Sequence, residues 1–304
     1  MSFSDSLRRA ALHVSILCLG LFSSGGLQAQ EPAAVDVPID LAAEELWQRT
    51  CKATLLRKSQ EAKAVTALDL SFNLITRGEG SLEIHPRVQW SSPNSIRLEL
   101  DGKEQVRGPD GDWLREGKEL IRLAGRDYAE DRRQIDQYLV IIQNFAALTN
   151  PKSLTLENLT IVKDLPFSFP KRHTLNRSKD RKRITWVRFE SADLQLPSEG
   201  GWAGDFPEKH LVFVAIDSAR DLPVMALIAD RRGEQTPLLL SLSDARALDD
   251  LRVPYETMVY PLIPSEPGSK KPFVIADKPA QELYIEGGTV RAKFKSKHFS
   301  WPKQ

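Results

Sequence analysis

The feature that most constrains this fold is the alternation of apolar and polar residues that begins at Leu68. A period of two sends neighbouring side chains to opposite faces of a strand, so each alternating run predicts a strand with one dry and one wet face. Short turns such as Asp101-Gly102 separate the runs, and connections this short join antiparallel neighbours. The stretch from Leu68 to Leu123 therefore predicts an antiparallel meander.

Two segments show helical periodicity instead. The first is predicted from Leu41 to Lys58, with Asp40 as its N-cap and an apolar stripe that includes Trp47 and Cys51. The second is predicted from Ala129 to Thr149 and is apolar nearly all round its middle. Such a helix is usually enclosed, so we expect it to fill or cover the concave side of the sheet.

After Asn150 the chain returns to β-rich runs, at residues 154–162, 184–189, 210–216, 224–229 and 237–242. Further along, the pattern predicts a short helix over 243–251, a turn at 286–288 and a final strand over 289–301. The chain shows no internal repeat and no change of composition. The predicted fold class is mainly β (α+β): an incomplete, curved antiparallel β-barrel with helices covering its concave side.

The N-terminus has the three parts of a secretory signal peptide. Arg8 and Arg9 precede a short apolar run, and small residues follow up to a predicted cleavage site after Ala29. The apolar run is too short to span a membrane. The prediction is thus a signal peptide over 1–29, a loose tether over 30–40, and one periplasmic domain over 41–304 with an extension from about residue 262.

The remaining residues argue against several classes of function. Lys and Arg number 42 against 41 Asp and Glu, a net charge of +1, whereas nucleic-acid-binding proteins usually have a basic excess. Cys51 is the only cysteine after signal removal, which predicts a core residue and no internal disulfide. The mature histidines stand in no spaced pair that would ligate a metal: His85, His173, His210 and His298.

No nucleophile elbow or phosphate-binding loop occurs, so neither an enzyme nor a cofactor is expected. A hydrolase whose site is assembled only by the fold stays an alternative. The basic stretch from Lys171 to Arg183 is either a solvated hairpin tip or a contact for an acidic partner or lipid headgroup.

Several short motifs, taken in their order, resemble one known family. They are Trp90-Ser-Ser-Pro-Asn94, Ile96-Arg-Leu-Glu-Leu-Asp-Gly102, Asp110-Gly-Asp-Trp113, Val214-Ala-Ile-Asp217, Asp221-Leu-Pro223 and Asp230-Arg-Arg-Gly233. Over residues 41–262 this order resembles the LolA-like outer-membrane lipoprotein carrier family, a lipoprotein-sorting family. The resemblance implies a half-open barrel with a helical lid that holds lipid or lipoprotein acyl chains.

On that analogy the ligand would contact six inward-facing residues: Leu70, Phe72, Leu98, Trp113, Ile142 and Phe145. The protein would be a monomer, with an envelope protein as a further partner. One departure concerns the arginine that precedes the Pro-Asn pair in the family and helps to hold the lid, because Ser92 stands there in this chain. A non-carrier envelope protein, structural or sensory, with a filled interior on the same fold is therefore the alternative.

Overall fold

The structure is a computed structural model that describes residues 40–56, 64–78, 80–170, 182–196, 209–232, 235–295 and 297–302. The predicted signal peptide and tether, and most of the basic stretch from Lys171, lie outside these residues. The described chain forms two compact units. Unit 1 comprises residues 66–142 and the part from Ala280 onward, and unit 2 comprises residues up to Val65 and 143–279. The single-domain organisation stays a prediction.

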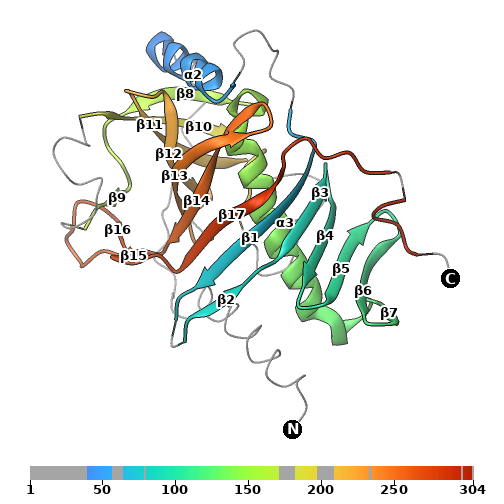
Figure 1. Ribbon diagram of the computed structural model, residues 1–304. Helices are drawn as coiled ribbons and strands as arrows, with labels where there is room; N and C mark the ends of the chain where they lie inside the picture. The colour runs from blue at the N-terminus through green and yellow to red at the C-terminus, as the bar shows by residue number, and fades with distance from the viewer. Residues whose placement is uncertain are drawn as a thin grey trace. The chain divides into compact units, whose positions relative to one another are not determined.

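The sheet of unit 1 is the meander predicted from the sequence, with one strand added from the C-terminal part of the chain (Figure 1). Its order is β7-β6-β5-β4-β3-β1-β17, and β2 pairs with β1. All these pairs are antiparallel. The strands are β1 (Ala67–Thr76), β2 (Leu82–Ile84), β3 (Arg87–Ser91), β4 (Ser95–Leu100), β5 (Lys103–Gly108), β6 (Gly111–Glu116), β7 (Glu119–Arg122) and β17 (Gln281–Thr289).

The turn between β4 and β5 illustrates why the meander forms. Leu100 pairs with Lys103, so Asp101 and Gly102 are the only two loop residues. Both have positive φ, 50° and 76°, as a type I′ hairpin requires, and Asp-Gly is one of the sequences that tolerate it best. The predicted turn is confirmed.

Unit 2 contains a second antiparallel run of strands in the order β14-β13-β12-β11-β10-β8. A small sheet, β15-β16-β9, belongs to the same unit. The strands are β8 (Glu157–Val162), β9 (Phe167–Ser168), β10 (Ile184–Ser191), β11 (His210–Asp217), β12 (Leu222–Ala229), β13 (Leu238–Leu248), β14 (Leu251–Tyr260), β15 (Leu262–Pro264) and β16 (Phe273–Ile275). The extension beyond residue 262 thus contributes strands to both units.

Buried side chains lie on both faces of the unit 2 sheet, except along residues 243–247 of β13, which are exposed. Neighbouring residues of β10 show this, because Val187 and Trp186 point to opposite faces and belong to two different apolar clusters. The first cluster joins the sheet to α2 (Leu41–Ala53), where Trp47 meets Phe189 edge to face at 5.2 Å. The second joins it to the small sheet through residues such as Phe167.

The two predicted helices are present. In α2 the predicted N-cap is confirmed, since Asp40 accepts a hydrogen bond from the Ala43 N–H at 3.1 Å. This helix ends at Ala53, five residues before its predicted end. Helix α3 has the predicted bounds, Ala129–Thr149. Neither described helix is long and apolar enough to cross a membrane. The mainly β, antiparallel class is confirmed, and within the described residues neither unit's strand order closes on itself.

Three local predictions are wrong. Residues 243–251 continue β13 and start β14 rather than forming a helix, because pairing with a neighbouring strand outweighs the helix propensity of the Ala-Arg-Ala-Leu run. Residues 286–288 are part of β17 at a β-bulge, not a turn. After Thr289 the chain leaves the sheet and forms no final strand.

Candidate functional site

The candidate site is the inner face of the unit 1 sheet, defined by the row Leu70, Val88, Leu98 and Leu114. Cross-strand partners share a face, and these residues are linked through the pairs 70–88, 88–98, 98–105 and 105–114. The exposed fraction of each is between 0% and 7%. The alternation in β1 places Phe72 on this face as well, at 1% exposure.

The part of α3 up to Ile142 covers the inner face (Figure 1). Ile135, Leu139 and Ile142 recur at helical spacing and are completely buried. Tyr138, on the same stretch, is also buried, and burial raises the pKa of its hydroxyl above the ordinary range. This part of the helix therefore offers an apolar surface that matches the apolar row of the sheet.

Polar side chains of β5 fasten the helix to the sheet. Arg107 donates to both carboxylate oxygens of Asp112, at 3.0 and 2.9 Å, and to Asp136 of α3. We call these three residues the Arg107 clamp; their side chains are 14–18% exposed. Burial lowers the pKa of Arg107, but hydrogen bonds to the two carboxylates and their charges outweigh this and raise the pKa above its usual value. The guanidinium is therefore charged at every ordinary pH.

A second polar contact between β5 and α3 involves Gln105, two residues before Arg107. Gln105 Nε2 donates to Asp131 Oδ1 of α3 at 3.2 Å. Burial raises the pKa of Asp131, and the hydrogen bond from Gln105 opposes that rise. Gln105 Oε1 and Trp90 Nε1 are buried and have no hydrogen-bond partner among the described residues. The side chains of Gln105 and Trp90 both belong to the inner face, since Trp90 pairs with Leu68 and Ile96. An unpaired buried donor or acceptor costs about 1–3 kcal/mol.

The structure brings together only part of the predicted ligand-binding set. Leu70, Phe72 and Leu98 share the inner face, and Ile142 lies on the covering helix. Phe145, further along α3, is buried at 8% exposure but belongs to unit 2. The sixth residue, Trp113, lies on the opposite, outer face and is therefore not part of this site.

The position of Trp113 follows from the register. It pairs with Val106, Val106 with Arg97, Arg97 with Gln89, and Gln89 with Asp69. Asp69 neighbours Leu70 in β1 and so points to the other face. The alternation of apolar and polar residues shows which residues of one strand share a face. It does not show which residues of β6 lie on the same face of the sheet as Leu70 of β1.

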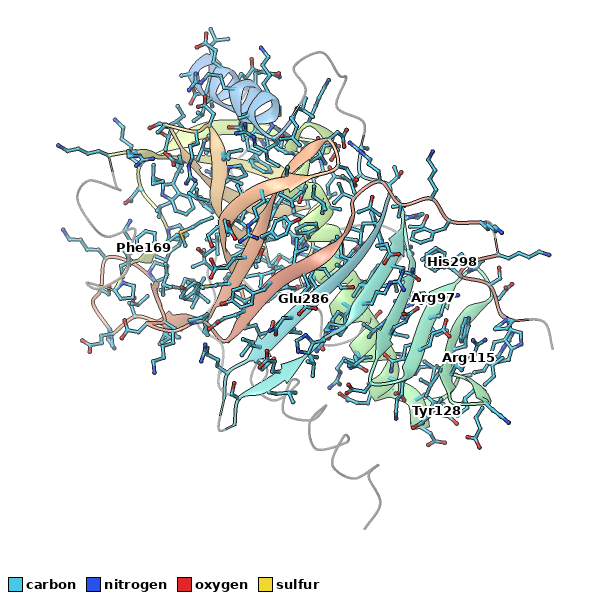
Figure 2. The ribbon with its side chains drawn as sticks, viewed as in Figure 1. Arg97, Arg115, Tyr128, Phe169, Glu286 and His298 are labelled. Carbon is cyan, nitrogen blue, oxygen red and sulfur yellow. The ribbon has the colours of Figure 1, made fainter. Side chains whose placement is uncertain are left out.

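The C-terminal strap, residues 290–295 and 297–302, covers part of this outer face. Figure 2 shows His298 close to Arg97, and Arg97 donates to the His298 carbonyl oxygen. Phe299, 6% exposed, packs with Val106 and Trp113. His298 Nε2 lies 2.9 Å from Gln89 Oε1. Burial and the nearby positive charge of Arg97 lower the pKa of His298, so the ring is neutral at pH 7. The strap therefore covers the outer face around Val106 and Trp113.

The Arg107 clamp was not predicted from the sequence. The signal for it was present, because Gln105 and Arg107 are polar residues at inward positions of a strand that pairs with an apolar one. Ser92 lies in the turn after β3, and its N–H donates to the Thr66 carbonyl oxygen at 2.8 Å. Among the described residues no group of three or more His, Cys, Asp or Glu could hold a metal ion.

Comparisons with known proteins add a likeness of fold. No family model and no curated protein matches the sequence. A LolA superfamily protein from Nitrosomonas europaea aligns with a TM-score of 0.43 at 8% identity, over 85% of this chain and 97% of that chain. A DUF1329 family protein from Desulfovibrio piger has the same TM-score at 12% identity, over 85% and 96%. A Vibrio parahaemolyticus domain described as an outer membrane lipoprotein-sorting protein domain has a TM-score of 0.39 at 12% identity, over 85% and 97%. The likeness concerns the course of the chain, and we take no function from it.

Proposed function

We propose that this protein is a periplasmic carrier or binding protein for an apolar ligand, lipid or lipoprotein acyl chains, held on the inner face of the unit 1 sheet. In this proposal the part of α3 up to Ile142 is a displaceable cover, and the ligand takes its place against Leu70, Phe72 and Leu98. The observation that carries the proposal is the pair of buried polar atoms without partners on this face, Trp90 Nε1 and Gln105 Oε1.

Those two atoms are a donor and an acceptor close to the apolar row of the sheet. A permanent core normally pairs such atoms, because each one left unpaired is costly. A ligand with an ester or amide near its acyl chain supplies a carbonyl oxygen that accepts from the Trp90 indole N–H. An amide also supplies an N–H that donates to Gln105 Oε1. An amphiphilic ligand would therefore pair two atoms that the covering helix leaves unpaired.

The energetics of exchange are favourable for a long chain. Each buried methylene group contributes about 0.8 kcal/mol, so a sixteen-carbon chain supplies on the order of 10 kcal/mol before entropic costs. Opening costs the apolar contacts of Ile135, Leu139 and Ile142 with the sheet. The charged groups of the Arg107 clamp recover hydration when they separate, which lowers the cost of opening relative to a wholly apolar contact.

A second candidate is a non-carrier envelope protein, structural or sensory, whose interior is filled. The observation that favours it is the unit 2 sheet, where both faces are packed with buried side chains. The two candidates differ in one measurable property, namely whether the inner face of unit 1 ever admits a ligand.

The test uses the mature protein purified from its native host. Lipid extraction followed by mass spectrometry is expected to release an acyl-chain compound, and delipidated protein is expected to take up dansyl-undecanoate with a rise in fluorescence. Asp136→Asn weakens the clamp at its helix end and should speed uptake several-fold. Glu130→Gln is the matched control, because Glu130 pairs with Arg133 of the same helix at 3.6 Å. Absence of both extracted lipid and probe uptake would reject the carrier and leave the filled-interior candidate.

A further inference from the structure

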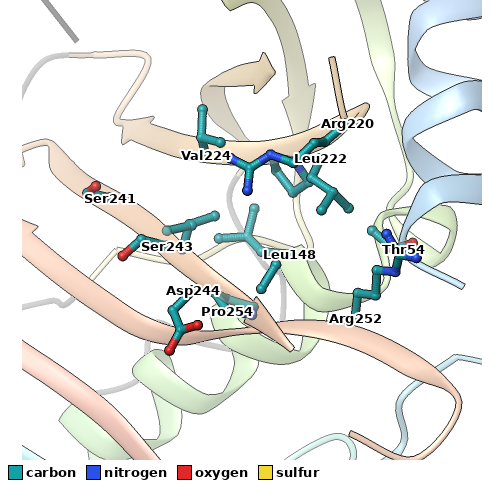
Figure 3. Close-up of a pocket in the computed structure, with 13 residues that line it drawn as sticks. Thr54, Leu148, Arg220, Leu222, Val224, Ser241, Ser243, Asp244, Arg252 and Pro254 are labelled. Atoms are coloured by element: carbon teal, nitrogen blue, oxygen red, sulfur yellow. The ribbon is translucent and has the colours of Figure 1, made fainter. Parts of the chain in front are cut away.

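A pocket in unit 2 has no role in the proposed function. It lies where the beginning of β12, the β13–β14 hairpin and the end of α3 meet, and its volume is about 220 Å³. Its floor is made by the buried side chains of Leu148, Leu222 and Leu242. Its mouth carries two exposed arginines, Arg220 and Arg252. Figure 3 shows Arg220 reaching over the pocket toward Leu148 and Arg252 lying beside Thr54.

The wall formed by the β13–β14 hairpin is irregular at the pocket. Ser243 pairs with Glu256 and Ala245 with Pro254, but Asp244 between them has a left-handed backbone, with φ at 53°. Aspartate tolerates this conformation better than most other residues, and Pro254, which pairs with Ala245, has no N–H to donate across the strands. The strand pairing is therefore interrupted at the place where the pocket opens.

The charges at the mouth favour an anion. Arg220 Nε donates to Asp217 at 2.8 Å, and Asp217 is only 5% exposed, so this contact fixes the Arg220 side chain. Within the described ranges the guanidinium of Arg252 makes no ion pair. The one carboxylate lining the pocket, Asp244, pairs with Arg246. An incoming anionic group thus meets two guanidinium groups, while the negative charge of Asp244 is already balanced.

We propose that this pocket binds a single-chain amphiphile with an anionic head, the chain on the Leu148–Leu222–Leu242 floor and the head between Arg220 and Arg252. A volume of about 220 Å³ lies below the roughly 300–1,000 Å³ of most small-molecule sites. The site therefore suits one short chain, of about eight carbons, and is too small for the several acyl chains of a lipoprotein. The site is separate from the inner face of unit 1 and does not depend on its function.

Chain length and a blocked pocket test the apolar part of the proposal. Isothermal titration calorimetry with butyrate, hexanoate, octanoate and decanoate should show about fourfold tighter binding per added methylene, levelling off near eight carbons, with octanoate at about 1 mM or tighter. Ala245→Trp places an indole in the pocket wall and should abolish octanoate binding. Ala247→Trp is the matched control, since Ala247 is an equally exposed alanine of β13 that does not line the pocket.

The preference for an anionic head group is tested by comparing an anionic ligand with a cationic ligand of the same chain length. Octanoate should bind at least about tenfold more tightly than octylamine, as two guanidinium groups predict. Arg252→Gln should remove most of that preference, whereas Arg188→Gln, at an exposed β10 arginine outside the pocket, should leave it unchanged.

Three results would overturn the proposal: no heat with octanoate, equal binding by the Ala245→Trp and Ala247→Trp proteins, or equal affinity for octanoate and octylamine. Uptake of dansyl-undecanoate by the Ala245→Trp protein, in which the unit 2 pocket is blocked, reports on the inner face of unit 1. If that uptake is intact while octanoate binding is lost, the two sites are distinct. If neither extracted lipid nor dansyl-undecanoate uptake is found and octanoate still binds, the proposed carrier function is rejected and the pocket stands.

Discussion

The attachment of the C-terminal strap depends on one glycine of β5. A Cβ atom built on Gly108 would lie 2.9 Å from the carbonyl carbon of Phe299 and closer still to its oxygen. Contacts below 3.0 Å essentially never occur for real Cβ atoms. In Gly108→Ala, therefore, either the strap must leave or the hairpin between β5 and β6 must move, and the strap is the less firmly anchored of the two.

The expected loss can be estimated from what the strap buries. Phe299 is 6% exposed against Val106 and Trp113, and full burial of a phenylalanine stabilises by about 1.5–3 kcal/mol. The backbone N–H of Trp301 also donates to the Asp110 carboxylate at 3.1 Å, a hydrogen bond worth about 1 kcal/mol. We expect Gly108→Ala to lower the free energy of unfolding by about 2–4 kcal/mol.

Gly287→Ala is the control, because Gly287 is also a strand glycine of unit 1 and a Cβ there would meet nothing within 4 Å. Its expected effect is neutral to stabilising, by up to about 1 kcal/mol. Urea unfolding followed by tryptophan fluorescence gives the stability difference, and trypsin cleavage after Lys293 or Lys295 reports release of the strap. Equal urea midpoints and equal cleavage rates for the two variants would refute this reasoning.

Three further predictions concern titration, thiol reactivity and the clamp. The folded-state pKa of His298 lies below its ordinary value of 6.5, so between those two values the unfolded chain binds more protons than the folded protein, and stability should fall as pH drops below about 6.5. His298→Gln should reduce the dependence of the urea midpoint on pH between pH 7.5 and 5.5, and an unchanged pH dependence would contradict this. Burial raises the pKa of the Cys51 thiol to about 11, so DTNB at pH 8 should label it only at the rate of unfolding, and fast labelling of the native protein would show an accessible thiolate. Arg107→Gln should lower the free energy of unfolding by about 2–4 kcal/mol because it leaves two carboxylates unpaired, whereas Arg115→Gln, whose side chain is 43% exposed, should change it by less than about 1 kcal/mol.

Much of the fold could be predicted because it depends on local periodicity. The alternation from Leu68 onward predicted the meander strands of unit 1 but not β17, and Asp101-Gly102 predicted its best-defined hairpin, since both signals are contained in a few consecutive residues. Helix α3 was predicted with its observed bounds for the same reason. Where local propensity and strand pairing disagreed, as over residues 243–251, pairing prevailed, and the mispredicted segment includes residues that line the unit 2 pocket.

The candidate site could be predicted only in part. Leu70, Phe72 and Leu98 were recognisable as inward residues, but the placement of Trp113 on the outer face follows from the register of five strands, which no single strand encodes. The Arg107 clamp joins positions 29 residues apart. Long-range contacts of this kind are set by how sheets and helices pack.

The sequence by itself therefore determined the meander strands from Leu68 to Leu123, the presence of the two helices, and which residues of each strand share a face. These properties follow from backbone geometry, which repeats every two or 3.6 residues. Only the tertiary structure decided that the C-terminal part returns to pair with β1, that the strap covers the outer face, and that Arg220 and Arg252 flank one pocket. Those features depend on contacts between residues far apart in the chain, whose partners are selected by the packing of the whole unit.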